Sequence, residues 1–281
     1  MDINRLCEIT RCNLDLYTEQ KNRIASGEKA HISQLCRYFC RADFTDDDPA
    51  RRLYTELTEK LSATDEERNI FCRLLYDTAK EENCNFFESV LSLKKPGKTA
   101  TVSYMRNPLS DKAYDKFSRH FNSLSASYEA SFSDCAQKLY IGECDYVILP
   151  ISDSNGRLLR FYSLIDRYEL RFALCCRVTD EVNDSENLFA LLCRDIVHFD
   201  CKGKTFLDLL LCDAKSDFVR LIDFSASLGI EPVVIDTMGT SFEDAKLHIV
   251  FDITDKSIYP LIAYTFLETP RHIIQGIYKE I

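Results

Sequence analysis

The sequence has little glycine and proline, no long apolar run and no excess of positive charge. Its 8 glycines and 7 prolines among 281 residues exclude a collagen-like or low-complexity chain. No stretch approaches the ~18 consecutive apolar residues of a membrane-spanning helix, and residues 1–5 lack the basic-then-apolar pattern of a signal peptide. The formal charge of −10 argues against nucleic acid or an anionic membrane as the main partner. We therefore expect a cytoplasmic globular protein.

The motifs that mark metal and nucleotide sites are also missing. The 13 cysteines are scattered and include no CxxC pair, and the five histidines are dispersed. The nearest approach to a metal signature, Cys193, His198 and Cys201, lacks a fourth partner at zinc-site spacing. There is no P-loop and no GxGxxG. The cysteines therefore read as small buried hydrophobes, and we expect neither a metal nor a cofactor.

What the sequence does contain is a helical pattern over residues 1–93. Apolar residues recur at threes and fours over 3–39, which predicts one very long helix. A second helix is expected after Asp48-Pro49, and Thr64-Asp65-Glu66-Glu67 is a capping box that opens a third. An elongated helix of this kind usually packs against a partner, so we expect a homodimer.

After a linker at residues 94–98 the pattern changes to alternating strands and helices. Residues 99–199 predict a single α/β domain, because its strands are separated by helices. The expected strands are Thr99–Met105, Tyr146–Ile151, Arg171–Val178 and Leu188–Arg194, and the expected helices are Asp111–Phe121, Phe132–Ile141 and Leu158–Tyr168. Residues 203–281 follow the order βαββαβ, which is the split, ferredoxin-like arrangement.

Taken in this order, the three segments resemble the bifunctional chorismate mutase–prephenate dehydratases of phenylalanine biosynthesis. The helical segment is similar to the all-helical chorismate mutases, whose cations hold a dicarboxylate substrate. Arg11 stands at the family's first carboxylate-binding Arg, and Asp48 with Arg51 matches its Asp-x-x-Arg. Thr78 and Glu82 stand at the usual Ser and Gln of the last helix. The resemblance implies that these five residues would carry mutase chemistry.

Two mutase positions depart from the family pattern. The second family Arg falls on Glu28, next to Lys29, which we take as a substitute ligand-binding cation, and the catalytic Lys falls on Phe39. A glutamate placed against a substrate carboxylate costs binding energy rather than contributing it.

The middle segment resembles one lobe of a prephenate dehydratase, a periplasmic-binding-protein-like fold. The stretch 142–151 is the most family-like in the chain. Of the family's glycine-rich turn only Ser110 remains, and the Glu-Asn-Ser/Thr motif has become Ser152-Asp153-Ser154, so Ser110 and Ser154 are the candidate ligand-binding residues. The catalytic Thr-Arg-Phe motif aligns with Asn187-Leu188-Phe189. The segment is also too short for the family's second lobe, so we expect dehydratase activity to be lost.

The last segment is similar to an ACT domain, the module with which these enzymes sense phenylalanine. Leu228-Gly229-Ile230 matches the family's helix-end Gly-Ile, whereas the effector-binding turn reads Ser216-Asp217-Phe218. Asp217 is a candidate partner for an amino group, although a helix N-cap explains it equally well.

The fold prediction is therefore a multidomain α plus α/β protein: a chorismate mutase-like helical dimerising segment (1–93), one prephenate dehydratase-like α/β lobe (99–199) and an ACT-like ferredoxin fold (203–281). For function we predict a degenerate family member with a regulatory or ligand-binding role toward a small aromatic or dicarboxylate ligand. Two alternatives stay open, a weak chorismate mutase and a non-catalytic dimeric scaffold.

Overall fold

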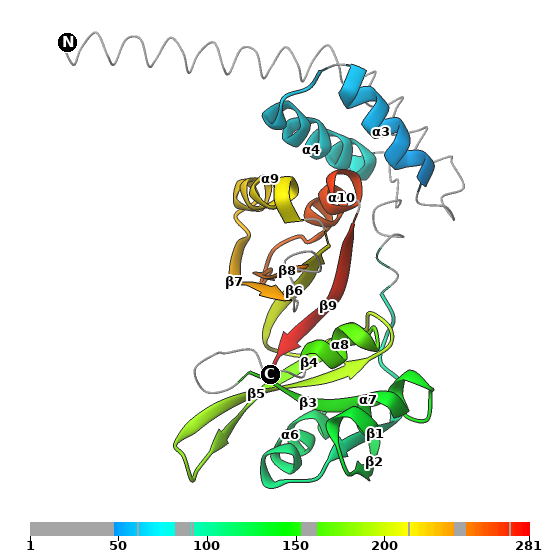
Figure 1. The fold of residues 1–281 in the computed structure, drawn as a ribbon, viewed down its shortest axis with the longest axis vertical. Helices are drawn as coiled ribbons and strands as arrows, with labels where there is room; N and C mark the ends of the chain where they lie inside the picture. Colours follow the sequence, from blue (N-terminus) through cyan, green and yellow to red (C-terminus); the bar gives the residue numbers. More distant parts are fainter. Residues whose placement is uncertain are drawn as a thin grey trace, which may run out of the picture. The chain divides into compact units, whose positions relative to one another are not determined.

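The computed structural model describes residues 48–60, 62–81, 91, 93–152, 162–212, 214–238, 246–269 and 271–281. The chain divides into two compact units (Figure 1). Unit 1 contains α3, α4 and residues 262–267 of α10, and unit 2 contains residues 91–261 and 268–281. The predicted long helix over 3–39 lies outside the described residues.

Unit 1 is helical in its described part. Its elements are α3 (Asp48–Lys60), α4 (Asp65–Glu81) and the central part of α10 (Tyr259–Glu268). The capping box that the sequence predicts is present, because Oγ1 of Thr64 accepts from the Glu67 amide at 3.3 Å and Oε2 of Glu67 accepts from the Thr64 amide at 2.8 Å. The ring of Tyr54 stacks on Phe71, with centroids 5.5 Å apart, and joins the two helices.

The first half of unit 2 is a layered α/β structure. Its elements are β1 (Thr99–Met105), α6 (Pro108–Ser118), β2 (Ser123–Glu129), α7 (Phe132–Tyr140), β3 (Tyr146–Ser152), α8 (Tyr162–Arg167), β4 (Arg171–Asp180) and β5 (Ser185–Cys193). The strands form the N-terminal half-sheet in the order β2-β1-β3-β5-β4. The first three strands run parallel, and β5 is antiparallel to both of its neighbours.

Helices cover both faces of the N-terminal half-sheet. Ala113 and Phe117 of α6 belong to the core on one face, while Leu139 of α7 and Ile165 of α8 belong to the core on the other. Every residue of β3 except Pro150 is buried, as expected for a strand with both faces covered. This layering agrees with the α/β organisation that the sequence predicts.

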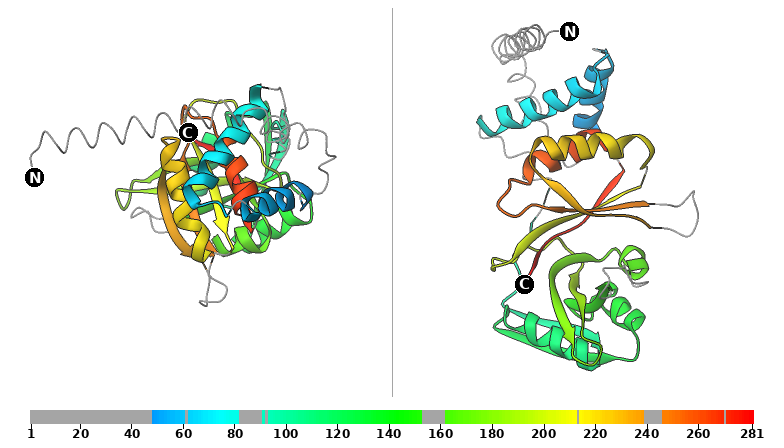
Figure 2. Two further views of the ribbon diagram at one scale, coloured as in Figure 1. Left: turned by 90° about the horizontal axis from the view of Figure 1, so that it is seen from above. Right: turned by 90° about the vertical axis from the view of Figure 1, so that its left-hand side faces the viewer.

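The second half of unit 2 has the predicted βαββαβ order. Its elements are β6 (Lys204–Leu211), α9 (Ala214–Ser227), β7 (Glu231–Met238), β8 (Lys246–Asp252), α10 and β9 (His272–Glu280). Its strands form the C-terminal half-sheet in the order β9-β6-β8-β7, which is the strand order of a split, ferredoxin-like unit. Figure 2 shows α9 along one face of these strands.

The two half-sheets join into one nine-stranded sheet through the parallel pairing of β4 with β9. Gly276 of β9 makes this joint possible. A Cβ at this position would lie 2.6 Å from the Phe172 carbonyl oxygen and 2.7 Å from the Phe172 Cβ. Only glycine therefore allows the two strands to approach as closely as they do.

The sequence pattern misses strand β2 and misplaces some boundaries. In β2 only Leu124 is buried, because the strand lies at the edge of the sheet; its alternation of Leu124, Ala126 and Tyr128 with serines is short and contains a single aliphatic residue larger than alanine. Helix α6 begins at Pro108, three residues before the predicted start, because the Asn107 side chain caps the amides of Leu109 and Ser110. The segment predicted as a linker makes a backbone hydrogen bond with the end of the α/β domain: the Lys94 amide donates to the Ile196 carbonyl at 2.9 Å.

Candidate functional site

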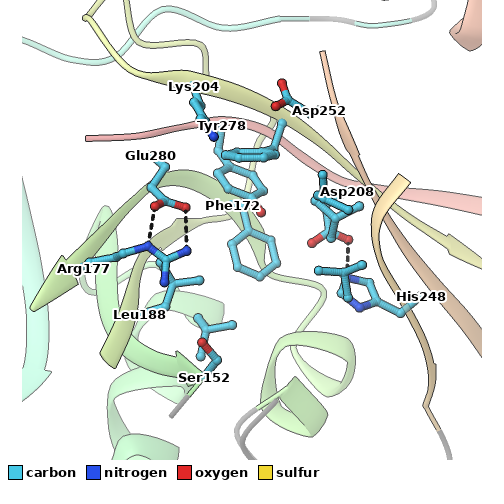
Figure 3. A pocket seen from close by; sticks show the side chains of 15 residues that line it. Ser152, Phe172, Arg177, Leu188, Lys204, Asp208, His248, Asp252, Tyr278 and Glu280 are labelled. Atoms are coloured by element: carbon cyan, nitrogen blue, oxygen red, sulfur yellow. Dashed lines mark hydrogen bonds and ion pairs between the residues drawn. The ribbon is translucent and has the colours of Figure 1, made fainter. Parts of the chain in front are cut away.

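A cavity of about 420 Å³ lies where the two half-sheets meet, and we call it the joint pocket (Figure 3). Its lining comes from strands β3, β4 and β5 of the N-terminal half-sheet and from all four strands of the C-terminal half-sheet. The size is within the range of small-molecule sites in proteins. Polar side chains enter it from opposite sides of an aromatic wall.

The register of the strands explains which side chains form the pocket. One row of paired residues crosses the sheet: Val234 of β7 pairs with Val250 of β8, Val250 with Asp208 of β6, Asp208 with Gly276 of β9, and Gly276 with Phe172 of β4. Paired residues share a face of the sheet. Asp208 is the charged member of this row, and Phe172 at its end packs directly against Gly276.

A buried acid–imidazole pair forms one side of the joint pocket. Nε2 of His248 lies 2.9 Å from Oδ1 of Asp208, and the two side chains are 2% and 1% exposed. His248 pairs with Leu210, two residues beyond Asp208, so the two polar side chains are diagonal neighbours on the same face. A carboxylate held in this way is removed from water, and its charge acts on the pocket with little screening.

An ion pair forms the opposite side. Nε of Arg177 donates to Oε1 of Glu280 at 2.6 Å, and Nη2 donates to Oε2 at 3.5 Å. Hydrogen bonding to Glu280 raises the pKa of the Arg177 guanidinium above its usual value. Arg177 therefore remains charged, and its charge is compensated by a partner within the protein.

Aromatic rings lie between the two charged pairs. The ring of Tyr278 contacts Phe172 with centroids 5.1 Å apart and Phe206 with centroids 5.6 Å apart. Burial raises the pKa of the Tyr278 phenol well above its usual value. This side chain is therefore a neutral aromatic surface at any physiological pH.

Two more charged residues, Lys204 and Asp252, complete the polar lining (Figure 3). The Asp252 carboxylate accepts a hydrogen bond from the Thr254 amide at 2.9 Å, and hydrogen bonding to Thr254 lowers the pKa of Asp252. The lining thus contains three carboxylates and two permanent cations, together with the imidazole of His248.

Most of the residues that the sequence singles out cannot be compared with this site. Arg11, Lys29, Glu82 and Ser154 lie outside the described residues. Asp48 and Asp217 lie in α3 and α9, but their side chains are outside the described part. Their predicted roles stay predictions.

Arg51 and Thr78 lie in unit 1. Nε of Arg51 donates to the Phe266 carbonyl at 2.7 Å, and the guanidinium lies 4.9 Å from the centroid of the Phe266 ring. Thr78 is buried on α4. The structure therefore gives Arg51 a packing role within unit 1.

Ser110 lies in the first turn of α6, apart from the lining of the joint pocket. It is fully buried, and its Oγ accepts from Nδ2 of Asn107 at 2.8 Å. This hydrogen bond belongs to the N-terminal cap of the helix and explains the serine structurally.

Two motif positions from the sequence do reach the joint pocket. Leu188 lines it at the position where the resemblance implies the Arg that binds the substrate carboxylate, and so does Ser152, the first residue of the altered Glu-Asn-Ser/Thr motif. Phe189, the last residue of the Thr-Arg-Phe match, is buried in the core.

Sequence reasoning missed Asp208, His248, Arg177 and Glu280. Asp208 gave a usable signal, because it interrupts the apolar run Phe206-Leu207-Asp208-Leu209-Leu210. An acidic residue in the middle of a buried strand must find a polar partner. The identity of that partner depends on the register of β6 against β8, which no local pattern gives.

No three His, Cys, Asp or Glu side chains of the described ranges gather as a group that could hold a metal ion. Within the same ranges, no helix combines the length and the apolar character needed to cross a membrane.

Compared by sequence, the chain matches no protein-family profile and no curated protein. Compared by structure, it is similar to a prephenate dehydratase from Streptococcus mutans, with 12% identity and a TM-score of 0.51 over 64% of this chain and 98% of that one. It is also similar to a prephenate dehydratase from Arthrobacter aurescens in complex with L-Phe, with 12% identity and a TM-score of 0.50 over 64% of this chain and 89% of that one. The larger part of this chain has a prephenate dehydratase-like fold. At such low identity the likeness concerns the fold alone.

Proposed function

We propose that the chain is a ligand-binding, regulatory protein that has the prephenate dehydratase fold without the dehydratase chemistry, and that the joint pocket is its binding site. The observation that carries this proposal is Leu188. It lines the pocket at the position where the family resemblance implies a substrate-binding Arg. Asn187 stands where the resemblance implies the catalytic hydroxyl.

The other groups in the pocket support binding rather than catalysis. Prephenate is a dicarboxylate, and its binding requires cations that are available to it. Arg177 is already paired with Glu280, so a substrate carboxylate would have to compete with a carboxylate of the protein. An aliphatic side chain at position 188 offers neither charge nor a hydrogen bond.

The C-terminal half-sheet fits a regulatory role. Its βαββαβ order is the arrangement of ACT domains, which sense small ligands in the family that the sequence resembles. In this proposal the ACT-like half and the dehydratase-like half together form one binding site. Dimerisation through the N-terminal helices is part of the same proposal and follows from their sequence pattern.

The alternative of a weak chorismate mutase rests on Arg11, Asp48, Arg51, Thr78 and Glu82. The contact of Arg51 with the Phe266 carbonyl and ring disfavours it, because substrate would have to displace both interactions. The scaffold alternative is disfavoured by the joint pocket, whose charged lining a purely structural core would not need.

The test is turnover of prephenate and of chorismate by the purified full-length chain, with a prephenate dehydratase assayed in parallel. We expect no phenylpyruvate above the buffer background. Phenylpyruvate formation that scales with protein concentration would overturn the loss of dehydratase chemistry. Chorismate consumption that is lost in Arg51→Ala, but kept in the exposed α4 variant Arg73→Ala, would establish the mutase instead.

A further inference from the structure

We propose that the joint pocket binds a small organic amine with an apolar or aromatic body, and that Asp208 receives the ammonium group. This inference rests on the proposed ligand-binding function and specifies its ligand class. Of the two ligand classes that the sequence suggested, aromatic and dicarboxylate, it keeps the first and departs from the second.

The charges of the lining favour a cation. Asp208, Asp252 and Glu280 supply three negative charges, against the positive charges of Arg177 and Lys204. Arg177 and Glu280 compensate each other at 2.6 Å. The other titratable groups of the lining are two carboxylates, one lysine and the imidazole of His248 against Asp208, so acceptors for an ammonium outnumber the permanent cations.

Burial makes Asp208 the strongest of these groups. Its side chain is 1% exposed, whereas Lys204 is exposed to solvent. Solvent screens interactions with a buried group less than those with an exposed one, so a polar contact with Asp208 is weakened less than one with Lys204. Each carboxylate oxygen can accept more than one hydrogen bond, so the contact of Asp208 with His248 does not prevent a further bond to an ammonium.

The aromatic wall provides the second half of the recognition. Phe172, Tyr278 and Phe206 form a continuous cluster of rings. Figure 3 shows Phe172 and Tyr278 between the Arg177–Glu280 pair and the Asp208–His248 pair. Aromatic faces attract ammonium groups through their quadrupole and also pack against an apolar body. A carboxylate gains nothing from such faces.

The volume of the joint pocket suits a ligand of this kind. At about 420 Å³ it accommodates a body of the size of a phenylethyl group.

The test compares two probes with similar aromatic bodies and opposite charge, 2-phenylethylamine and 3-phenylpropionate. Titration calorimetry with the full-length chain at pH 7 should give a dissociation constant at least tenfold lower for the amine. Equal binding of the two probes, or tighter binding of the carboxylate, would overturn the proposal. So would the absence of saturable amine binding.

Variants then locate the site. Asp208→Asn should weaken amine binding at least tenfold, whereas the exposed α9 variant Asp223→Asn should not change it. Because Asp208 is buried and its variant could unfold, two milder variants test the same point. Glu280→Gln leaves Arg177 uncompensated and should shift the preference toward 3-phenylpropionate.

Val234→Trp, on the edge strand and in the lining, should block the pocket, whereas Ile235→Trp, which is exposed and outside the lining, should not.

The outcomes separate this inference from the proposed function. Absent dehydratase turnover together with absent amine binding would reject the amine and leave the loss of dehydratase chemistry standing. Amine binding that survives Val234→Trp and Asp208→Asn would place the amine elsewhere and reject the assignment of the joint pocket.

Discussion

Nε2 of His248 lies 2.9 Å from Oδ1 of Asp208, and together they form a buried polar pair that bridges strands β6 and β8. Burying such a pair costs desolvation energy that its mutual attraction only partly offsets. A protein without use for the pair would be at least as stable with apolar residues. Its presence at the wall of a cavity therefore points to a role in binding.

This relationship predicts different effects of single and double substitutions. Asp208→Ala leaves the imidazole buried without the carboxylate and should lower the free energy of unfolding by about 3 kcal/mol. The double variant Asp208→Leu/His248→Leu should recover most of that loss, because both polar groups are replaced by apolar ones. Urea unfolding measures both. A double variant less stable than Asp208→Ala would mean that the pair itself stabilises the fold.

The close approach of β9 to β4 at Gly276 gives a second prediction. In Gly276→Ala the new methyl group would collide with the backbone of Phe172, and we expect a loss of about 2–3 kcal/mol in the free energy of unfolding. Gly142→Ala is a matched control, because its φ is +81° but nothing lies within 4 Å of the added Cβ. It should lose about 1 kcal/mol, the cost of left-handed backbone alone. If urea unfolding gave equal losses of unfolding free energy for Gly276→Ala and Gly142→Ala, the close approach of β9 to β4 would be contradicted.

The buried cysteines predict how stability depends on pH in the alkaline range. Burial raises the pKa of Cys135 and Cys144 to about 11 and that of Cys176 and Cys193 to about 12. The ordinary thiol pKa is about 8.5, so as the pH rises the unfolded chain loses these protons first. Their contribution to stability is complete below about pH 8.5 and is lost as the pH rises toward the folded values.

The free energy of unfolding should therefore fall from pH 9 to 11, by up to about 1.4 kcal/mol per pH unit for each thiol. Denaturant unfolding across this range measures the slope. Cys176→Ala should make the slope shallower, whereas Cys212→Ala, at a part-buried position, should change it less. A flat profile, or one that rises with pH, would contradict the burial of these thiols.

The packing role of Arg51 predicts a local effect in unit 1. Arg51→Ala removes the bond to the Phe266 carbonyl and the contact with its ring, which together contribute about 1–2 kcal/mol. Hydrogen exchange of the α3 amides should become correspondingly faster. The exposed variant Arg73→Ala should leave exchange within about 0.5 kcal/mol of wild type. Unchanged hydrogen exchange of the α3 amides in Arg51→Ala would contradict the packing role and would favour the mutase role of Arg51.

Periodic segments could be predicted from the sequence, and the site could not. Strand β3 stands out as an apolar run and β1 as an alternation of Ala100, Val102 and Tyr104 with polar residues. The capping box at Thr64 and Glu67 is a purely local pattern. The order βαββαβ follows from the same signals. Strand β2 was missed because an edge strand needs few apolar residues.

The joint pocket depends on contacts between distant segments. Arg177 and Glu280 are 103 residues apart, and Asp208 and His248 are 40 apart. Their pairing follows from the parallel register of β4 with β9 and the antiparallel register of β6 with β8. The family resemblance directed attention to motif positions, of which Leu188 and Ser152 do line the pocket, but the charged pairs lie at positions that the motifs do not include.

The most direct test of the joint pocket as the functional site is a crystal structure of the full-length chain with 2-phenylethylamine. The account predicts the ammonium within hydrogen-bond distance of the Asp208 carboxylate and the phenyl ring against Phe172 and Tyr278. An amine bound elsewhere, with the joint pocket unchanged, would contradict it.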